Sequence, residues 1–278
     1  MALIINTNVS SLTAQRNLTN SQNDLSVALN RLSSGLRINS AKDDAAGLFV
    51  AGQLTRDIRG INQAIRNSAD GISLGQTAEG ALGEIANNLQ RIREIAIQAS
   101  NDTVGNADGL QLEVDQLTQE ISRIIQTTEF NGTALLSATI DLNFQVGPNG
   151  SATNQINLTT ASAVTAISGY AANLTATGTI VVSSTGAASA TLSGLSAAID
   201  TVNGQRATFG AIQNRFEAVI SNLQNYAENL TAARSRIEDA DFAQETASLT
   251  RAQILQQAGV SILAQANVLP QAALSLLG

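Results

Sequence analysis

The chain of 278 residues contains no cysteine, no histidine and no tryptophan. Without cysteine it can form neither a disulfide scaffold nor a thiolate nucleophile, and without histidine it has no imidazole base. Together the two absences remove the sulfur and nitrogen ligands that zinc and similar metals prefer. We therefore expect a protein that is not an enzyme and that binds no cofactor or metal.

Aromatic and basic residues are also scarce. Aromatic side chains make up 3% of the chain and hydrophobic residues 44%, which favours long aliphatic helix seams over a core with aromatic anchors. The 15 basic residues form no stripe and are outnumbered by 22 acidic ones, so nucleic acid is a poor partner. No apolar run approaches the roughly 20 residues that span a bilayer. The first residues lack the basic and apolar regions of a secretory signal. We expect no membrane insertion, and secretion would need another route.

Charge is missing from both ends and from the middle of the chain. No charged residue precedes Arg16, none lies between residues 142 and 199, and only Arg251 follows Glu245. The two ends are rich in Leu, Ile, Val and Ala at helical spacing. Large exposed apolar surfaces are unusual on soluble monomers, so we expect the ends to be buried against other copies of the chain.

Helical periodicity dominates the first half of the sequence. Leu25, Leu29, Leu32 and Leu36 follow one another in steps of four and three, as in a coiled-coil seam, and the pattern breaks at residues 33–35. The sequence therefore predicts an N-terminal helix that ends at this break.

A second and much longer helix is predicted to follow. Ser40 and Asp43 have the spacing of a capping box, and the apolar period runs from about residue 41 to residue 99. At about 1.5 Å per residue such a helix would be about 90 Å long. A third helix is expected over residues 110–124, with Asn131-Gly132 as its stop signal.

The apolar period changes to two between residues 140 and 146, which indicates a strand. Residues 147–150 carry a turn signal, residues 156–158 supply the return strand, and residues 179–184 are a candidate for a further strand. The middle of the chain is therefore predicted to hold a small β insert.

Helical spacing resumes after this insert. It runs from residue 195 to residue 230, is interrupted by acidic residues at 238–241, and returns in a last segment that Pro270 is expected to end or kink. The predicted fold class is mainly α, a long helical hairpin or coiled-coil bundle with a small β-hairpin insert. The terminal helices should lie side by side, and we expect them to become ordered only in an assembly.

Several segments of this chain resemble bacterial flagellin, the filament protein of the bacterial flagellum. They include INTNVSSL (5–12), LNRLSSGLRINSAKDDAAGL (29–48), GISLGQTAEGALGEI (71–85), ARSRIEDADFA (233–243) and QILQQAGVSILAQAN (253–267). The resemblance implies a non-catalytic subunit that self-assembles into the filament used for motility. Its terminal helices would line an inner tube and its long helices an outer tube. The stretch between Leu136 and Leu192 is too short for a full outer domain, so the resemblance is to a minimal member.

The resemblance also divides the chain and implies its location. The expected parts are an N-terminal inner-core helix (1–43), outer-core long helices (44–136), a short β insert (137–190), a C-terminal outer-core helix (191–239) and a C-terminal inner-core helix (240–278). The family is exported unfolded through the flagellar channel without a cleaved signal peptide. We therefore expect an extracellular location in the flagellar filament.

Three sets of site residues follow from the periodicity and the resemblance. Self-assembly is assigned to Leu25, Leu29, Leu32, Leu36, Leu255, Ile262 and Leu269. The resemblance implies that Arg91, Ile95 and Asp115 contact the vertebrate flagellin-sensing Toll-like receptor. It implies that Leu249, Ile254, Leu263 and Leu276 bind the flagellar export chaperone as an apolar helix face. Filament cap and hook-junction proteins are the other expected partners.

Each assignment has an alternative. The receptor candidates would also serve helix packing and filament contacts, and the C-terminal helix would also serve the filament core alone. The carboxylates at 43–44 and 238–241 fit solvated charges at helix junctions better than a metal site. For the whole chain the alternatives are a hook–filament junction protein with flagellin-like ends, and a secreted helical adhesin or receptor ligand that acts as a monomer.

Overall fold

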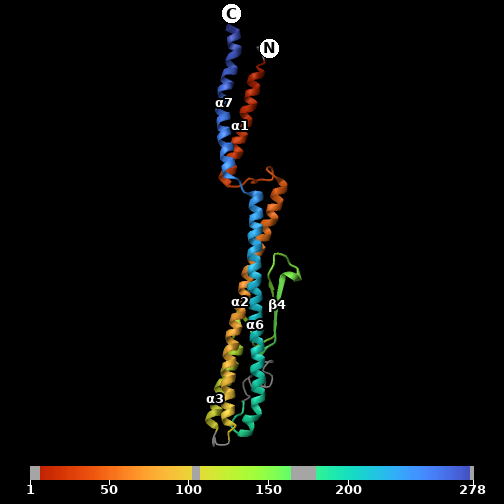
Figure 1. The fold of residues 1–278 in the computed structure, drawn as a ribbon, viewed down its shortest axis with the longest axis vertical. Coiled ribbons are helices and arrows are strands. Elements are labelled where there is room, and N and C mark those ends of the chain that lie inside the picture. The colour runs from red at the N-terminus through yellow and green to blue at the C-terminus, as the bar shows by residue number, and fades with distance from the viewer. Residues whose placement is uncertain (1–6, 102–106, 164–179, 276–278) are drawn as a thin grey trace. The chain divides into compact units, whose positions relative to one another are not determined.

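The computed structural model describes residues 7–101, 107–163 and 180–275, with side chains as far as Val268 in the last range. The chain divides into two compact units. We call residues 1–56 with 228–278 the terminal unit, and residues 57–227 the central unit. Figure 1 traces the elements of both units. None of the helices within the described ranges contains an apolar stretch of the length that a bilayer requires.

The first helix of the terminal unit, α1, spans Val9–Ser34. The side chain of Asn8 caps its start by accepting a hydrogen bond from the backbone N–H of Ser11. Gly35 follows its end with a φ of 73°, a left-handed conformation that glycine adopts without steric cost. The predicted break at residues 33–35 is confirmed.

The long helix α2 spans Ala45–Ala99, so its predicted end is confirmed and its predicted start is wrong by four residues. The Asp43 carboxylate accepts bonds from the Ser40 hydroxyl and N–H, which closes a turn ahead of the helix. Asp44 is the actual cap, because its Oδ1 accepts a bond from the N–H of Gly47 at 2.9 Å. The capping-box spacing therefore marks a turn rather than the helix start.

Two helices form the C-terminal part of the chain. α6 spans Thr185–Glu238 and α7 spans Phe242–Ser275. The predicted acidic interruption lies between them, where Asp241 accepts a bond from the N–H of Ala243 at 2.9 Å. Pro270 does not end the last helix, since α7 continues to Ser275. The other expectation, a kink at Pro270, stays a prediction.

The central unit packs α2, α3 (Asp108–Thr127) and α6 around an aliphatic core. α3 extends the predicted 110–124 helix by two residues at its start and three at its end. The fully buried side chains include Leu82, Ile85, Leu89, Ile92, Ile121, Ile125 and Phe209. This core depends on aliphatic residues at steps of three and four, as the sequence predicts.

Two small antiparallel hairpins follow α3. β1 (Glu129–Phe130) and β2 (Thr133–Ala134) are joined by Asn131 and Gly132, whose φ values are 50° and 76°. Two consecutive residues with positive φ fit a type I′ hairpin turn, for which Asn-Gly is the preferred pair. The prediction that this pair stops the preceding helix is wrong, because α3 already ends at Thr127.

The second hairpin confirms the predicted β insert. β3 (Ile140–Gln145) pairs with β4 (Gln155–Thr160), in a register that sets Ile140 opposite Thr160. A short 3₁₀ turn, η1 (Ala152–Asn154), lies between the two strands. The inward residues alternate along β4, as expected for a strand with one covered face.

The candidate strand at 179–184 is not present over residues 180–184, and residue 179 lies outside the described ranges. Instead, the side-chain amide of Gln111 takes the place of a neighbouring strand. Its Nε2 donates to the carbonyl of Ile180 and its Oε1 accepts from the N–H of Val182, each at 2.7 Å. These bonds satisfy the backbone of an extended segment, and α6 can then begin at Thr185, earlier than the expected residue 191.

Candidate assembly and partner-binding surfaces

The terminal helices α1 and α7 lie side by side in the terminal unit (Figure 1). Their facing side chains are half-buried or buried and recur in steps of three and four. On α1 these are Ser11, Ala14, Leu18, Ser21, Leu25, Ala28 and Leu32, and on α7 they are Leu249, Ala252, Gln256, Gly259, Leu263 and Ala266. We call this surface the seam. Many seam residues are small, and a Cβ on Gly259 would lie 3.4 Å from Leu18 Cδ1, so the helices approach closely.

Polar contacts lock both ends of the seam. Near the end of α1, the Arg31 guanidinium lies 2.9 Å from the carboxylate of Glu245. Near its start, Ser11 Oγ donates to Asn267 Oδ1 at 2.9 Å, and Asn8 Nδ2 donates to the carbonyl of Ala266 at 2.8 Å. The start of α1 meets the later part of α7, so the pair is antiparallel with a fixed register.

α7 carries a second apolar face that does not belong to the seam. Its large side chains are more than half exposed: Ile254, Leu255, Val260, Ile262 and Val268. On α1, Val9, Leu12, Val27 and Leu29 are exposed as well. We call the α7 residues Leu255, Ala258 and Ile262, which follow one another in steps of three and four, the outer stripe. Nothing in the described part of a single chain covers it.

The residues predicted for self-assembly therefore fall into two groups. Leu25 and Leu32 are half-buried in the seam, whereas Leu29, Leu255 and Ile262 are exposed. A further member, Leu36, is half-buried beyond the end of α1, where its backbone pairs with that of Asp239. The side chain of the last member, Leu269, lies outside the described side chains.

The chaperone candidates are divided in the same way. Leu249 and Leu263 are half-buried in the seam, while Ile254 is 60% exposed. Leu276 lies outside the described residues. A partner that bound this whole helix face would have to separate Leu249 and Leu263 from α1.

The receptor candidates lie in the central unit on α2 and α3. Arg91 is half exposed and contacts Glu113 at 2.7 Å and Glu94 at 3.2 Å. Its hydrogen bond with Glu113, followed by the one with Glu94, raises the pKa of Arg91 above its ordinary value. Asp115 is half-buried and accepts a bond from Gln111 Nε2 at 2.8 Å.

Ile95 does not share that surface. Its side chain is 1% exposed and belongs to the core of the central unit. Arg91 and Asp115 are therefore accessible in this conformation, whereas Ile95 is not.

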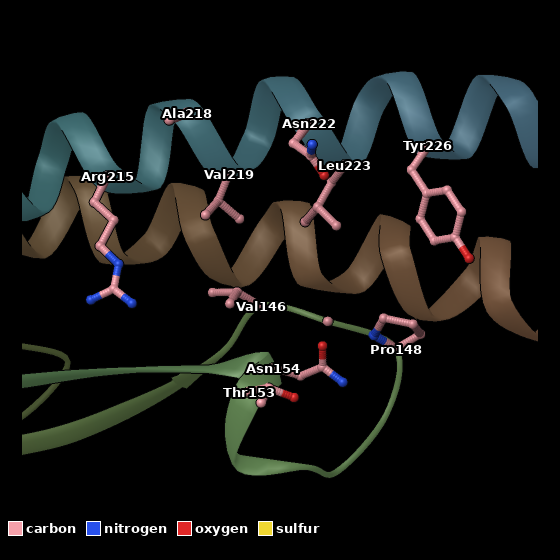
Figure 2. Close-up of a pocket in the computed structure, with 11 residues that line it drawn as sticks. Val146, Pro148, Thr153, Asn154, Arg215, Ala218, Val219, Asn222, Leu223 and Tyr226 are labelled. Atoms are coloured by element: carbon pink, nitrogen blue, oxygen red, sulfur yellow. The ribbon is translucent and has the colours of Figure 1, made fainter.

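A groove that no sequence pattern predicted lies between the loop after β3 and α6, as Figure 2 shows. It measures about 470 Å³ and is lined by Arg215, Val219, Leu223 and Tyr226 of α6 and by Val146 and Pro148 of the loop. Val146 and Val219 belong to the same apolar cluster as Phe144 and Phe216, whose rings meet edge to face with centroids 5.2 Å apart. Only the Gly147-Pro148 turn signal pointed to this region, because the groove depends on how the hairpin packs on α6.

Comparisons with known proteins agree with this architecture. Two family models match the chain, the bacterial flagellin N-terminal helical region over residues 5–141 and the bacterial flagellin C-terminal helical region over residues 192–277. A flagellin of Halalkalibacterium halodurans is 45% identical over 278 residues, covering 99% of this chain and 100% of the relative. Flagellin D of Vibrio anguillarum is 36% identical over a 377-residue alignment that covers all of both proteins.

Among solved structures, a protein described as a putative flagellar hook-associated protein from Vibrio parahaemolyticus is similar in fold. Its TM-score is 0.57 at 13% sequence identity, covering 71% of this chain and 100% of that one. At this identity the likeness concerns the fold alone.

Proposed function

The chain belongs to the bacterial flagellin family, and from that premise we propose which of its surfaces build the filament and which meet other partners. It is a structural subunit of the bacterial flagellar filament, in which many copies associate and which serves motility. The alignment with Flagellin D of V. anguillarum is 377 residues long and covers all of both proteins, so this chain of 278 residues is a short flagellin.

The outer stripe of α7 is the surface that joins copies in this proposal. The supporting observation is that Leu255 and Ile262 are 51% and 59% exposed, although the seam with α1 is complete. Burying the exposed half of one such side chain contributes roughly 1 kcal/mol, about half of the value for a whole side chain, and a filament repeats that contribution in every copy. Leu29, exposed on α1, and Leu269 on α7 belong to the same proposed interface, while Leu25, Leu32 and Leu36 hold the terminal unit together.

The five-part division from inner core (1–43 and 240–278) to outer core (44–136 and 191–239) and β insert (137–190) remains our proposal for how the chain is placed in the filament. It is supported by the exposed apolar side chains of the terminal unit and by the family membership. An extracellular location, reached through the flagellar export channel without a cleaved signal peptide, belongs to the same proposal.

The export chaperone is proposed to bind α7 in place of α1. Leu249 and Leu263 pack against α1 in the seam, so the chaperone and α1 would compete for the same side chains. A chaperone-bound chain would then lack the paired terminal unit and could not polymerise early. Filament cap and hook-junction proteins are proposed to meet the same terminal unit after the chaperone has left.

The host Toll-like receptor is proposed to contact Arg91 and Asp115, while Ile95 packs in the core of the central unit and contributes indirectly. Two observations support this proposal: the half-exposed guanidinium of Arg91, and the fixing of Asp115 by Gln111. The ion pairs of Arg91 with Glu94 and Glu113 would have to yield to the receptor.

Seeded polymerisation tests the filament interface. Short filament seeds are added to the purified chain, to a truncation that lacks residues 260–278, and to a Leu255→Ser/Ile262→Ser double variant, and growth is followed by electron microscopy. We expect long filaments from the original chain, none from the truncation, and at least about tenfold slower growth from the double variant, because two exposed aliphatic anchors are lost.

The matched control is Leu112→Ser, which removes a leucine that is 67% exposed in the central unit. This variant should grow as the original chain does. Long filaments from the truncation would overturn the assignment of the outer stripe to assembly.

A hook–filament junction protein is the alternative function. The likeness to a hook-associated protein concerns the fold alone, whereas both matching family models are those of flagellin. Short rings instead of long filaments in the seeded experiment would revive this alternative.

A further inference from the structure

Three charged side chains on α1 and α7 have no partner in the described part of the chain: Arg16, Asp24 and Arg251. Of these three, Asp24 and Arg251 line a common groove. Arg251 is the only charged residue after Glu245, and Asp24 is the only carboxylate on α1. Within the part of the chain that the structure describes, neither side chain forms a hydrogen bond or an ion pair.

Both residues line one groove of the terminal unit, together with Val27, Leu255 and two further arginines. The first of these, Arg31, is occupied by Glu245 at 2.9 Å. The second, Arg37, donates to the carbonyl of Ile237. Asp24 and Arg251 face the same groove without reaching each other within ion-pair distance, so each remains available to a partner outside the chain.

The position of Arg251 ties it to assembly. It lies four residues before Leu255 on α7, so it begins the outer stripe that continues through Ala258 and Ile262. A second copy that covers this stripe would also take the guanidinium out of water. Leaving a charge unpaired in such a place is strongly unfavourable, so the covering copy should supply a carboxylate.

Most other carboxylates of the terminal unit are already engaged. Asp43 is held by Ser40, Asp44 by Gly47, Asp239 by Ser235, Asp241 by Ala243 and Glu245 by Arg31. The remaining ones, Glu228 and Glu238, belong to α6 rather than to the terminal pair. Asp24 is therefore the carboxylate that a neighbouring terminal pair can offer.

We propose that Arg251 of one copy forms an ion pair with Asp24 of a neighbouring copy, and that this pair fixes the axial register between them. The inference rests on the proposed filament function. Apolar side chains of the outer stripe give adhesion that is tolerant of sliding, whereas a single charge pair is satisfied at one offset only. Val27 and Leu255 flank the two charges and would exclude water from the pair.

Charge exchange between copies tests the pair. Asp24→Arg and Arg251→Asp are each expected to slow seeded elongation at least about tenfold, because each leaves two like charges facing each other at the interface. An equimolar mixture of the two variants should recover growth to within about threefold of the original chain. Where the variants alternate in the mixture, the introduced arginine of one faces the introduced aspartate of the other. The Asp24 and Arg251 that remain unchanged face each other at the next contact.

Specificity is controlled by a single chain that carries Asp24→Arg and Arg16→Asp together. This chain has the same net charge as the average of the mixture, but it keeps two like charges at positions 24 and 251, so its elongation should stay slow. Helix content measured by circular dichroism verifies that every variant is folded.

The outcomes separate the pair from the filament function. If the original chain does not elongate, the proposed filament function is wrong, and the ion pair that rests on it is wrong as well. If each single variant elongates as the original does, the pair is absent. If a chain that carries both Asp24→Arg and Arg251→Asp elongates but the mixture of the two single variants does not, the pair forms within one copy and the proposal is overturned.

Discussion

A single added methyl group should distinguish two glycines of α2. A Cβ on Gly71 would lie 2.6 Å from the ring of Phe216, whereas a Cβ on Gly80 would have no neighbour within 4 Å. Gly71→Ala should lower the free energy of unfolding by about 1–3 kcal/mol because it overpacks the contact. Gly80→Ala should raise it by about 0.5–1 kcal/mol because alanine favours the helix. Urea unfolding of the full chain measures both, and a stabilising Gly71→Ala would show that this contact is loose.

The carboxyl group of Asp43 should titrate below its ordinary range. The Ser40 hydroxyl, followed by the N–H groups of Ser40 and Asn39, donates to it, and these bonds lower the pKa of Asp43. A carboxyl with a lowered pKa in the folded state stabilises the fold above its ordinary pKa of about 3.9. That contribution is lost as the pH falls through the lowered value.

Ser40→Ala should therefore move the pKa of Asp43 upward, which an NMR titration of the carboxyl carbon measures. Ser73→Ala is the control, because the Ser73 hydroxyl bonds to the carbonyl of Ala69 in its own helix. An unchanged Asp43 pKa in Ser40→Ala would mean that the hydroxyl is not the main cause.

At the scale of elements, the turn between β1 and β2 depends on one glycine. Gly132 has a φ of 76°, a conformation that costs other residues roughly 1–2 kcal/mol. Gly132→Ala should lower the free energy of unfolding by about that amount. Gly150→Ala, in the loop between β3 and β4, has open space and no positive φ, so it should change little. Equal effects of the two variants in urea unfolding would contradict the type I′ assignment.

The α1/α7 pair should loosen when its ion pair is removed. Glu245 is 13% exposed at its side chain and holds Arg31, so Glu245→Gln should weaken the pairing by about 1–2 kcal/mol. Hydrogen exchange of the α1 amides should speed up accordingly. Glu120→Gln is the control, because the pair of Glu120 with Arg123 is exposed and lies within one helix. Unchanged exchange in α1 would show that the apolar seam alone sets its stability.

Much of the element order can be predicted from the sequence, because it depends on local period and punctuation. The steps between the leucines of α1 and the break that ends in the left-handed Gly35 are local features, and the structure confirms both. The start of α2 escapes prediction because Asp43 and Asp44 are adjacent and either can accept backbone bonds. The role of Gln111 cannot be found in the sequence, since its partners at 180–182 are distant along the chain.

The candidate surfaces show a different limit. Hydrophobic spacing identifies Leu255 and Ile262 as residues that need burial, but it does not say against what. The seam of α7 with α1 uses small and polar residues such as Ala252, Gln256 and Gly259 instead. Close helix approach selects small side chains, and that preference leaves little trace in an apolar pattern. The buried position of Ile95 is likewise hidden, because neighbouring residues on one helix can face opposite sides.

At the scale of the whole molecule, the charge is unevenly divided. The terminal unit has 8 basic and 8 acidic residues, and the central unit has 7 basic and 14 acidic ones, which together account for the net charge of −7. Copies should therefore repel one another mainly through their central units. Raising the ionic strength from about 0.01 M to about 0.15 M shortens the screening length from about 30 Å to about 8 Å, so seeded elongation should become several-fold faster.

Sodium chloride is compared with sucrose at equal osmolality, so that solute effects other than screening are controlled. Elongation that slows steadily with salt would show that attraction between opposite charges, rather than repulsion, governs the approach of two copies.

The contacts at the two ends of the seam determine how accurately the geometry of one copy is repeated along the filament. Arg31 with Glu245 at one end, and Ser11 with Asn267 at the other, are both lost if α1 slides by one heptad along α7. A small dimensional error that one isolated protein would tolerate accumulates when a part is repeated many times over. Because each copy fixes the register of α1 against α7 at two points, that error is kept small within every copy. A flagellin in which α1 could take several registers along α7 would still fold, but its polymer would lose a uniform pitch.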